Sequence, residues 1–454
     1  MTAAPHDHGV PFDEAVRVWT RVAALSFGGP AGQIAVMHRI VVDEKRWIGE
    51  ARFLHALNYC MLLPGPEAHQ LAIYLGWLMH GVRGGLVAGT LFVLPGFVLL
   101  LGLSMLYAAH GGAGALAGLF FGLKAAVLAV VLQAVARIGK RALGNGAQKA
   151  VALAAFLALF VLDAPFPLVV LGAGLVGWAA TRAGSTRFRP GGHGAAARGL
   201  SDADSRLGNW SPPPGGLAAL RVPLILLALW LAPVAALALG LGPDDVFARL
   251  GIFFSQMAMV SFGGAYAVLA YVAQQAVETY RWLAPGEMLD GLGLAETTPG
   301  PLIIVVEFVG FLAAFRNAGS LDPWVAGTLG ATLVVWTTFL PSFLWIFLGA
   351  PHVERLRGDA ALAGALSAIG AAVVGVILNL ALWFALHFVF TQVTRWSGFG
   401  LSLDLPDPGS LDPAALALSL GAVAAAFGLR LSLGWLLGVW AGLGLAWWAM
   451  GGLA

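Results

Sequence analysis

The sequence predicts an all-α, polytopic membrane protein built from two inverted-topology repeats with interrupted helices. Three observations support this prediction. First, 59% of the 454 residues are hydrophobic and only 11% are charged, whereas a soluble domain usually carries about 25% charged residues. Second, several apolar runs are long enough to cross a bilayer. Third, a set of short motifs occurs twice in the same order.

The composition also narrows the class of function. Sixty-one glycines and 16 tryptophans fit closely packed helices with anchors at the bilayer interface. A net charge of +2 gives no reason to expect a nucleic-acid partner. Cys60 is the single cysteine, which leaves no intramolecular disulfide and no cysteine metal cluster. We therefore expect no metal and no cofactor. The N-terminal segment lacks the pattern of a signal peptide, so we expect it in the cytoplasm.

The expected membrane spans form two series. They cover residues 84–110, 112–139, 148–162, 166–183 and 218–241, then 325–349, 361–390, 411–428 and 431–450. A spanning helix needs about 20 residues, so the runs 148–162 and 411–428 are marginal. Residues 184–217 are rich in Arg, Pro and Gly, which is typical of a flexible linker.

The internal repeat sets the predicted domain organisation. Three motifs recur at a constant separation of 235 residues: SFGG at 26 and 261, RW at 46 and 281, and PGP at 64 and 299. Two further matches, Leu94-Pro95 with Leu340-Pro341 and the apolar runs from Leu123 and Ile369, are separated by 246 residues. We expect a first repeat at 1–183, a cytoplasmic linker at 184–217, and a second repeat at 218–454 with its core at 245–390.

The positions of the basic residues predict that the two repeats are inverted. Short cytoplasmic loops are enriched in Lys and Arg. The span 84–110 starts after Arg83, whereas its counterpart 325–349 ends before Arg355 and Arg357. Equivalent helices would then cross the membrane in opposite directions, as in many secondary transporters. Arg395 falls on the outer side in this scheme and is one charge against it.

The two Pro-Gly-Pro motifs predict helix breaks. Proline lacks an amide hydrogen and clashes with the preceding helical turn, but it suits the first position of a new helix. Pro66 and Pro301 should therefore each precede a helix start. Free amides at such a start attract anions, and a break at membrane depth is tolerated where it is buried or lines a cavity. The predicted product is a mid-membrane site for a small oxyanion.

The same motifs carry a resemblance to the chromate ion transporter family, in its two-domain form. SFGGP near the N-terminus, the following RW, LPGPE with a later QLA, and the second copies SFGG and TPGP are similar to that family over essentially the whole chain except the linker and the tails. The resemblance implies a secondary transporter that exports chromate across the bacterial cytoplasmic (inner) membrane and is proton-coupled. It implies chromate or sulfate, protons and the lipid bilayer as partners, and leaves a homodimer open.

The candidate substrate contacts are neutral groups at the breaks together with one cation. The candidates are Ser26, Gly28, Gly29, Gly65, Gln70, Lys124, Ser261, Gly263, Gly264, Thr297, Thr298 and Gly300. Thr297 and Thr298 could instead cap a helix. Lys124 lies in the middle of an expected span, where a cation is costly and usually functional. It could face a dianion, pair with Glu67 or another acid, or extend its ammonium group to the membrane surface.

Three groups are candidates for proton coupling, each with a structural alternative. Glu67 at a helix start could carry a proton or cap the helix. His69 titrates nearest physiological pH but could be an interfacial histidine. Glu307 lies deeper, in an apolar helix, and could carry a proton, line the pathway or bond to a neighbouring helix. The alternatives to a carrier are an oxyanion channel or sulfate importer of the same fold and, from another class, a membrane-embedded enzyme using Glu67 and His69. The latter is disfavoured because no known catalytic motif is present.

Overall fold

The computed structural model describes residues 8–27, 29–61, 63–110, 114–188, 200–208, 220–262, 265–350 and 360–452. Helices make up nearly all of this part of the chain, and its one sheet is the antiparallel hairpin β1–β2. The predicted all-α class is therefore confirmed.

The described part of the first half contains eight helical elements. They are α1 (Phe12–Leu25), α2 (Gly29–His38), the π-helix η1 (Arg39–Glu44), α3 (Glu50–Cys60), α4 (Glu67–His110), α5 (Gly114–Ala142), α6 (Gly146–Phe160) and α7 (Phe166–Arg182). A connecting helix, α8 (Arg221–Gly240), follows the Arg-rich segment.

The second half repeats this order with one replacement and three additions. Its elements are α9 (Val246–Met259), α10 (Ala265–Gln274), the π-helix η3 (Gln275–Thr279), α11 (Pro285–Thr297), η4 (Leu302–Ile304), α12 (Val305–Arg316), α13 (Pro323–Gly349), α15 (Ala360–Val389), β1 (Val393–Gly398), β2 (Leu401–Pro406), η6 (Pro408–Ser410), α16 (Pro413–Phe427) and α17 (Leu433–Ala449). Helices α12 and α13 stand in place of α4, and η4, the β1–β2 hairpin and η6 are added.

The correspondence between the halves extends to local detail. A π-helix follows α2 and another follows α10, and Arg46 and Arg281 share a positive φ of 52° and 54°. Helices α6 and α16 both have 15 residues, and α7 and α17 both have 17. The β1–β2 hairpin lies between α15 and α16, where the first half has only the short connection from α5 to α6.

Within the described residues, five helices are long and apolar enough to cross a membrane: α4, α5, α8, α13 and α15. Five further apolar helices are shorter: α6, α7, α9, α16 and α17. The 15 residues of α6 and α16 give only about 22 Å of helix, so these two are as marginal as the sequence indicates. Helix α4 starts earlier than the predicted span and bends at His80 and Gly81, whose φ/ψ angles are non-helical. The chain is a multi-pass membrane protein.

The chain divides into two compact units, each of which draws on both halves of the sequence. Unit 1 comprises Met1–Gly102, Gly192–Ala265 and Thr298–Gly358, and unit 2 comprises Leu103–Gly191, Tyr266–Thr297 and Asp359–Ala454. Within unit 1, α13 packs against α8, α9 and α12. Gly310 on α12 lies against Gly330 and Val334 on α13, and the absence of side chains at both glycines permits this close approach.

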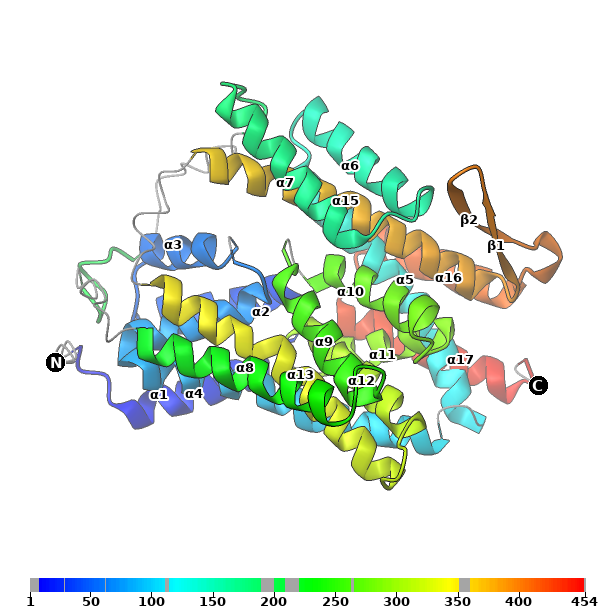
Figure 1. The fold of residues 1–454 in the computed structure, drawn as a ribbon, viewed down its shortest axis with the longest axis horizontal. Helices are drawn as coiled ribbons and strands as arrows, with labels where there is room; N and C mark the ends of the chain where they lie inside the picture. The colour runs from blue at the N-terminus through cyan, green and yellow to red at the C-terminus, as the bar shows by residue number, and fades with distance from the viewer. Residues whose placement is uncertain are drawn as a thin grey trace. The chain divides into compact units, whose positions relative to one another are not determined.

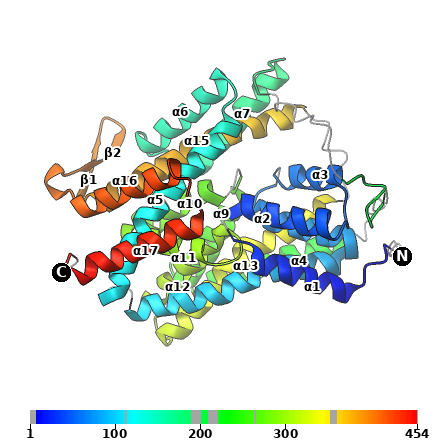
Figure 2. The same cartoon turned by 180° about the vertical axis from the view of Figure 1, so that it is seen from behind.

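Unit 2 is organised around two long helices. Helix α15 packs against α6 and α7, as Figure 1 shows, and α5 packs against α16 and α17 (Figure 2). Each long helix therefore pairs with the two short helices of the other half of the sequence. Glycines carry both contacts: a Cβ at Gly118 or Gly122 of α5 would clash with α17, and a Cβ at Gly364 of α15 would clash with α7.

Candidate functional site

The first Pro-Gly-Pro motif interrupts the helical chain as predicted. Helix α3 ends at Cys60, α4 begins at Glu67, and Pro64, Gly65 and Pro66 lie between them. Gly65 has a φ of 129°, a conformation that residues with a side chain rarely adopt. The first bond within α4 runs from the Gln70 amide to the Pro66 carbonyl over 2.9 Å. The amides of the first turn before Gln70 have no partner inside the helix.

The second motif produces an equivalent break. Helix α11 ends at Thr297, and a short 3₁₀ turn, η4, precedes α12. Gly300 has a φ of 108°, close to the conformation of Gly65. Pro301 directly precedes the new helical segment. Both predicted helix breaks are therefore present, and both lie at the predicted residues.

Each break bonds to the SFGG motif of the other half of the sequence, within unit 1. The Gly65 amide donates to the Ser261 carbonyl over 2.9 Å, and the Gly300 amide donates to the Ser26 carbonyl over 2.8 Å. The two serine hydroxyls donate to carbonyls of their own helices, at 2.6 Å for Ser26 and 2.7 Å for Ser261. In this structure the serines therefore contact the breaks through their backbone, while their hydroxyl protons are engaged elsewhere.

Two buried glutamines hold the breaks from the side. Gln70 donates through Nε2 to the Pro64 carbonyl over 2.8 Å, and Gln33 on α2 donates to the Gly300 carbonyl over 2.5 Å. The Oε1 atom of each amide has no hydrogen-bond partner in the described part of the chain. The sequence reasoning identified Gln70 but missed Gln33, whose only signal was a polar residue in the apolar run GPAGQIAVM.

More buried polar atoms without partners belong to unit 1. Among the described residues they include Ser342 Oγ, Thr338 Oγ1, both ring nitrogens of His69 and both carboxylate oxygens of Glu307. A Cβ placed on Gly65 would lie 2.9 Å from Ser342 Oγ, so this hydroxyl is next to the first break. Buried polar groups in native proteins nearly always have a partner. This set makes unit 1 the candidate for a site that binds polar species.

His69 and Glu307 are more enclosed than the sequence indicated. The His69 ring is fully buried among three aromatic rings, with centroids 5.2 Å from those of Phe339 and Phe343 and 6.4 Å from that of Phe92. That position does not fit an interfacial histidine. The Glu307 side chain is completely buried in α12. Glu67 is the first residue of α4, at the end of the helix where a carboxylate is favoured by the helix dipole.

The remaining predicted contacts have mixed positions. Gly29 starts α2 with a φ of 72°, whereas Gly28, Gly263 and Gly264 lie outside the described residues. Thr297 is exposed, and its hydroxyl donates to the Leu294 carbonyl of its own helix, while Thr298 is buried. Lys124 belongs to unit 2, where its Nζ lies 3.3 Å from Asp290 Oδ1. An acid partner for Lys124 was one alternative, and the partner in the structure is Asp290 rather than Glu67.

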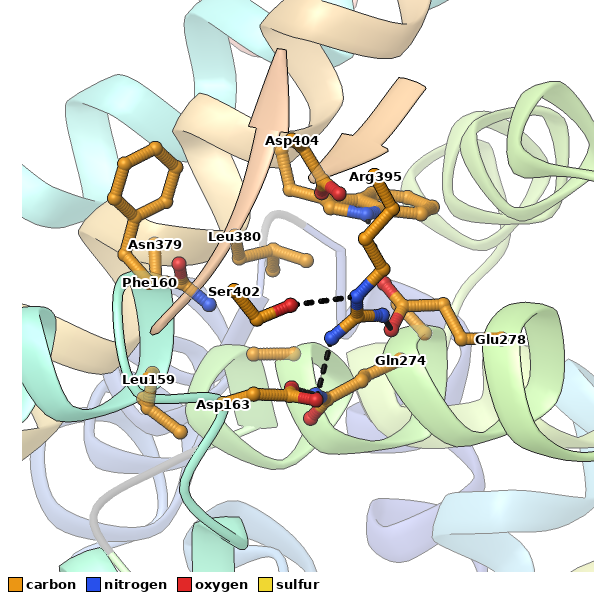
Figure 3. Close-up of a pocket in the computed structure, with 13 residues that line it drawn as sticks. Leu159, Phe160, Asp163, Gln274, Glu278, Asn379, Leu380, Arg395, Ser402 and Asp404 are labelled. Carbon is orange, nitrogen blue, oxygen red and sulfur yellow. Dashed lines mark hydrogen bonds and ion pairs between the residues drawn. The ribbon is translucent and has the colours of Figure 1, made fainter. Parts of the chain in front are cut away.

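One small cavity of about 40 Å³ lies in unit 2, lined by α6, α10, α15 and the hairpin, together with Asp163 and Glu278 (Figure 3). Arg395 on β1 forms ion pairs there with Asp163 and with Glu278, the latter over 2.5 Å, and donates to Ser402 over 2.8 Å. Asp404 also lines the cavity. Three carboxylates against one guanidinium make this cavity unsuitable for a dianion.

A multi-pass helical membrane protein with paired helix breaks around buried polar groups belongs to the class of transport proteins. The sequence profile described as "Chromate transporter" matches residues 14–178 and 248–447. The chain belongs to this family, and both of its halves match the profile.

Individual relatives agree with this assignment. The chain is 33% identical over 356 residues to a chromate transport protein of Pseudomonas aeruginosa. This alignment covers 78% of this chain and 76% of the relative. It is 29% identical over 380 residues to a chromate transport protein of Cupriavidus metallidurans, with 83% and 84% covered. A probable chromate transport protein of Synechococcus elongatus is 25% identical over 405 residues, with 87% and 92% covered. No solved structure matches the chain.

Proposed function

We propose that this protein is a secondary transporter that exports chromate, or a similar tetrahedral oxyanion such as sulfate, across the cytoplasmic membrane in a proton-coupled manner. Its two halves are inverted repeats, and its N-terminus is cytoplasmic. The family and the names of its relatives support chromate as the substrate. Only the family and the names of the relatives distinguish chromate from sulfate, because both anions are tetrahedral and carry two negative charges.

The observation that carries this proposal is the reciprocal bonding of the two breaks. The pairs Gly65–Ser261 and Gly300–Ser26 join each break to the other half of the sequence. The first-turn amides of α4 lie outside the helical hydrogen-bond pattern, as at any helix start. These amides form the positive end of a helix dipole, which suits an anion. Gln70 and Ser342 place additional neutral polar atoms beside the same break.

Neutral donors are suited to a transported anion. A site made of amides and hydroxyls binds an oxyanion by hydrogen bonds and dipoles without a permanent ion pair. A fixed buried cation would hold a dianion strongly in a medium of low dielectric constant and slow its release. In unit 1 no Lys or Arg is among the described groups that bond to Gly65, Gly300 or the two glutamines.

Glu307 is the group at this site best suited to proton coupling. An ionised carboxylate without partners is costly in buried surroundings, and binding a proton removes that cost. His69 and Glu67 are the other candidates on the same unit. We assign coupling first to Glu307, because both of its oxygens lack partners among the described residues and its side chain is fully buried.

Transport of labelled chromate into everted membrane vesicles tests the proposal. We expect accumulation that depends on an imposed pH gradient, that unlabelled sulfate reduces, and that Gly65→Ala abolishes. Gly102→Ala is the matched control, because a Cβ at Gly102 of α4 meets no atom within 4 Å. Absence of chromate accumulation in vesicles that contain the folded wild-type protein would refute the substrate. Accumulation that is indifferent to the pH gradient would refute the coupling.

A further inference from the structure

A buried ion pair with a tyrosine forms a second polar cluster, in unit 2. Asp290 on α11 is only 4% exposed. Its Oδ2 atom accepts a hydrogen bond from the Tyr107 hydroxyl at 2.9 Å, and its Oδ1 atom lies 3.3 Å from Lys124 Nζ. The Lys124 side chain is 21% exposed, so the pair is closed on the side of the acid and partly open on the side of the ammonium.

The surroundings contain few other charges. Helix α11 packs against α5, α15 and α17. Helix α5 contributes Lys124 and, further along, Arg137, which acts electrostatically on Glu296. In their described ranges, α15 has His387 as its single titratable residue and α17 has none. On α11 itself, Glu287 is a second carboxylate that acts electrostatically on Asp290. Lys124 is therefore the cation that balances Asp290.

The backbone around Lys124 is adapted to its ammonium group. A Cβ on Gly286 would lie 3.2 Å from Lys124 Nζ, tighter than an ordinary contact. Gly286 and Asp290 are four residues apart and lie on one face of α11. One face of this helix therefore provides both the space for the ammonium and the carboxylate that pairs with it.

The repeat argues against a purely structural role for the pair. At the repeat separations of 235 and 246 residues, His55 is the position equivalent to Asp290, and Gly370 is the position equivalent to Lys124. The same helix order thus forms in the other half of the chain without this ion pair. Buried ion pairs also stabilise proteins poorly, because desolvation offsets the attraction of the charges. A charged pair present in one repeat and absent from the other is better explained by function.

We propose that Asp290 is a proton-binding site of the transport cycle, with Lys124 as its counter-charge and Tyr107 as its positioning residue. The inference rests on the proposed function and adds a second proton-binding residue to the one proposed there, Glu307. A proton that enters forms an O–H bond on the Asp290 carboxylate and removes its negative charge. The attraction to Lys124 is then lost, and the Tyr107 hydroxyl can turn to accept instead of donating. Protonation thereby weakens the ion pair that joins α5 to α11.

Purified protein in liposomes tests this role with two separate assays. Counterflow of labelled against unlabelled chromate reports exchange without a pH gradient, and accumulation under an imposed pH gradient reports coupling. We expect Asp290→Asn to keep counterflow within about twofold of the wild type and to lose about tenfold in gradient-driven accumulation. Asp290 can be replaced together with Lys124→Met, which keeps the charge balanced if the single variant does not fold. The double variant should show the same separation of the two assays.

Two further variants separate a proton site from a structural pair. Tyr107→Phe removes a donor that favours the charged carboxylate, so the pH midpoint of coupled transport should move upward by up to about one pH unit. Glu287→Gln, on the same helix, is the control; it removes the smallest of the electrostatic influences on Asp290 and should leave both assays within about twofold of the wild type. Wild-type accumulation in the double variant would overturn the inference, and so would loss of counterflow and accumulation together. Absence of counterflow in the wild type would instead refute the proposed function on which it rests.

Discussion

The amide of Gly65 donates a hydrogen bond of 2.9 Å to the carbonyl of Ser261, a residue nearly 200 positions away. The equivalent atoms of Gly300 and Ser26 form the same bond over 2.8 Å. Both glycines have a positive φ, which residues with a side chain rarely adopt. A repeated local sequence thus produces a repeated long-range contact, and the two helix breaks depend on each other.

Replacement of Gly65 by alanine should disrupt this arrangement. The new Cβ would lie 2.6 Å from Gln70 Nε2 and 2.9 Å from Ser342 Oγ, and the φ of 129° is strained for any side chain. We expect transport to be lost, with a strain of about 1–3 kcal/mol at this position. Gly300→Ala should reduce transport less, because the new Cβ would lie 3.5 Å from its nearest neighbour, the Phe92 carbonyl oxygen, and only the backbone strain remains. Chromate uptake normalised to folded protein measures both effects, and equal activity of Gly65→Ala and Gly102→Ala would contradict the interpretation.

The contact between α5 and α17 predicts a sharp difference between two neighbouring glycines. A Cβ on Gly444 would lie 2.2 Å from the Gly118 carbonyl oxygen, whereas a Cβ on Gly442 would meet nothing within 4 Å. Gly444→Ala should therefore lower the free energy of unfolding by about 1–3 kcal/mol. Gly442→Ala should change it by less than about 1 kcal/mol, or raise it, since alanine favours a helix. Thermal unfolding in detergent compares the two, and equal melting temperatures would show that the helices do not pack as described.

A neutral isostere at Glu307 should separate folding from coupling. Glu307→Gln keeps the shape of a side chain that has no described partner, so no bond is lost and unfolding should shift by less than about 1 kcal/mol. Gradient-driven accumulation should fall, while exchange of chromate for chromate continues. The matched comparison is Glu67→Gln, at the half-buried first residue of α4. Intact coupling in Glu307→Gln would remove this residue from the proton pathway.

Much of this architecture was predictable because its signals are local and repeated. Proline has one backbone consequence wherever it stands, so the breaks at Pro64–Pro66 and Pro299–Pro301 could be located from sequence. Glycine in the same motif indicated unusual backbone angles, and Gly65 and Gly300 have them. The apolar runs identified the spanning helices for a similar reason, since hydropathy is additive along the chain.

The partners of polar side chains were not predictable, because partners distant in sequence leave no local pattern. Gln33, Tyr107 and Asp290 were missed for this reason, and for Lys124 the sequence left open both a substrate role and an acid partner without identifying Asp290. The serine hydroxyls illustrate a second limit. A hydroxyl in a helix competes for carbonyls of the preceding turn, and at Ser26 and Ser261 that local bond takes the proton.

The ion pairs of Arg395 with Asp163 and Glu278 predict a pH effect on stability that is independent of transport. Burial raises the pKa of Glu278 above its ordinary value of 4.5, and the Arg395 guanidinium opposes this shift. Between 4.5 and the raised pKa the folded protein holds a proton that the unfolded chain has released, so the free energy of unfolding should fall as pH rises through that window. Glu278→Gln should flatten the profile, and Arg395→Met should extend the fall to higher pH by removing the opposing charge.

Unfolding in detergent from about pH 4 to about pH 8 measures this pH dependence of the free energy of unfolding. Arg249→Met, which breaks an exposed pair with Asp244, is the control and should keep the wild-type slope. Parallel profiles for Glu278→Gln and the wild type would show that this carboxyl does not titrate in the window.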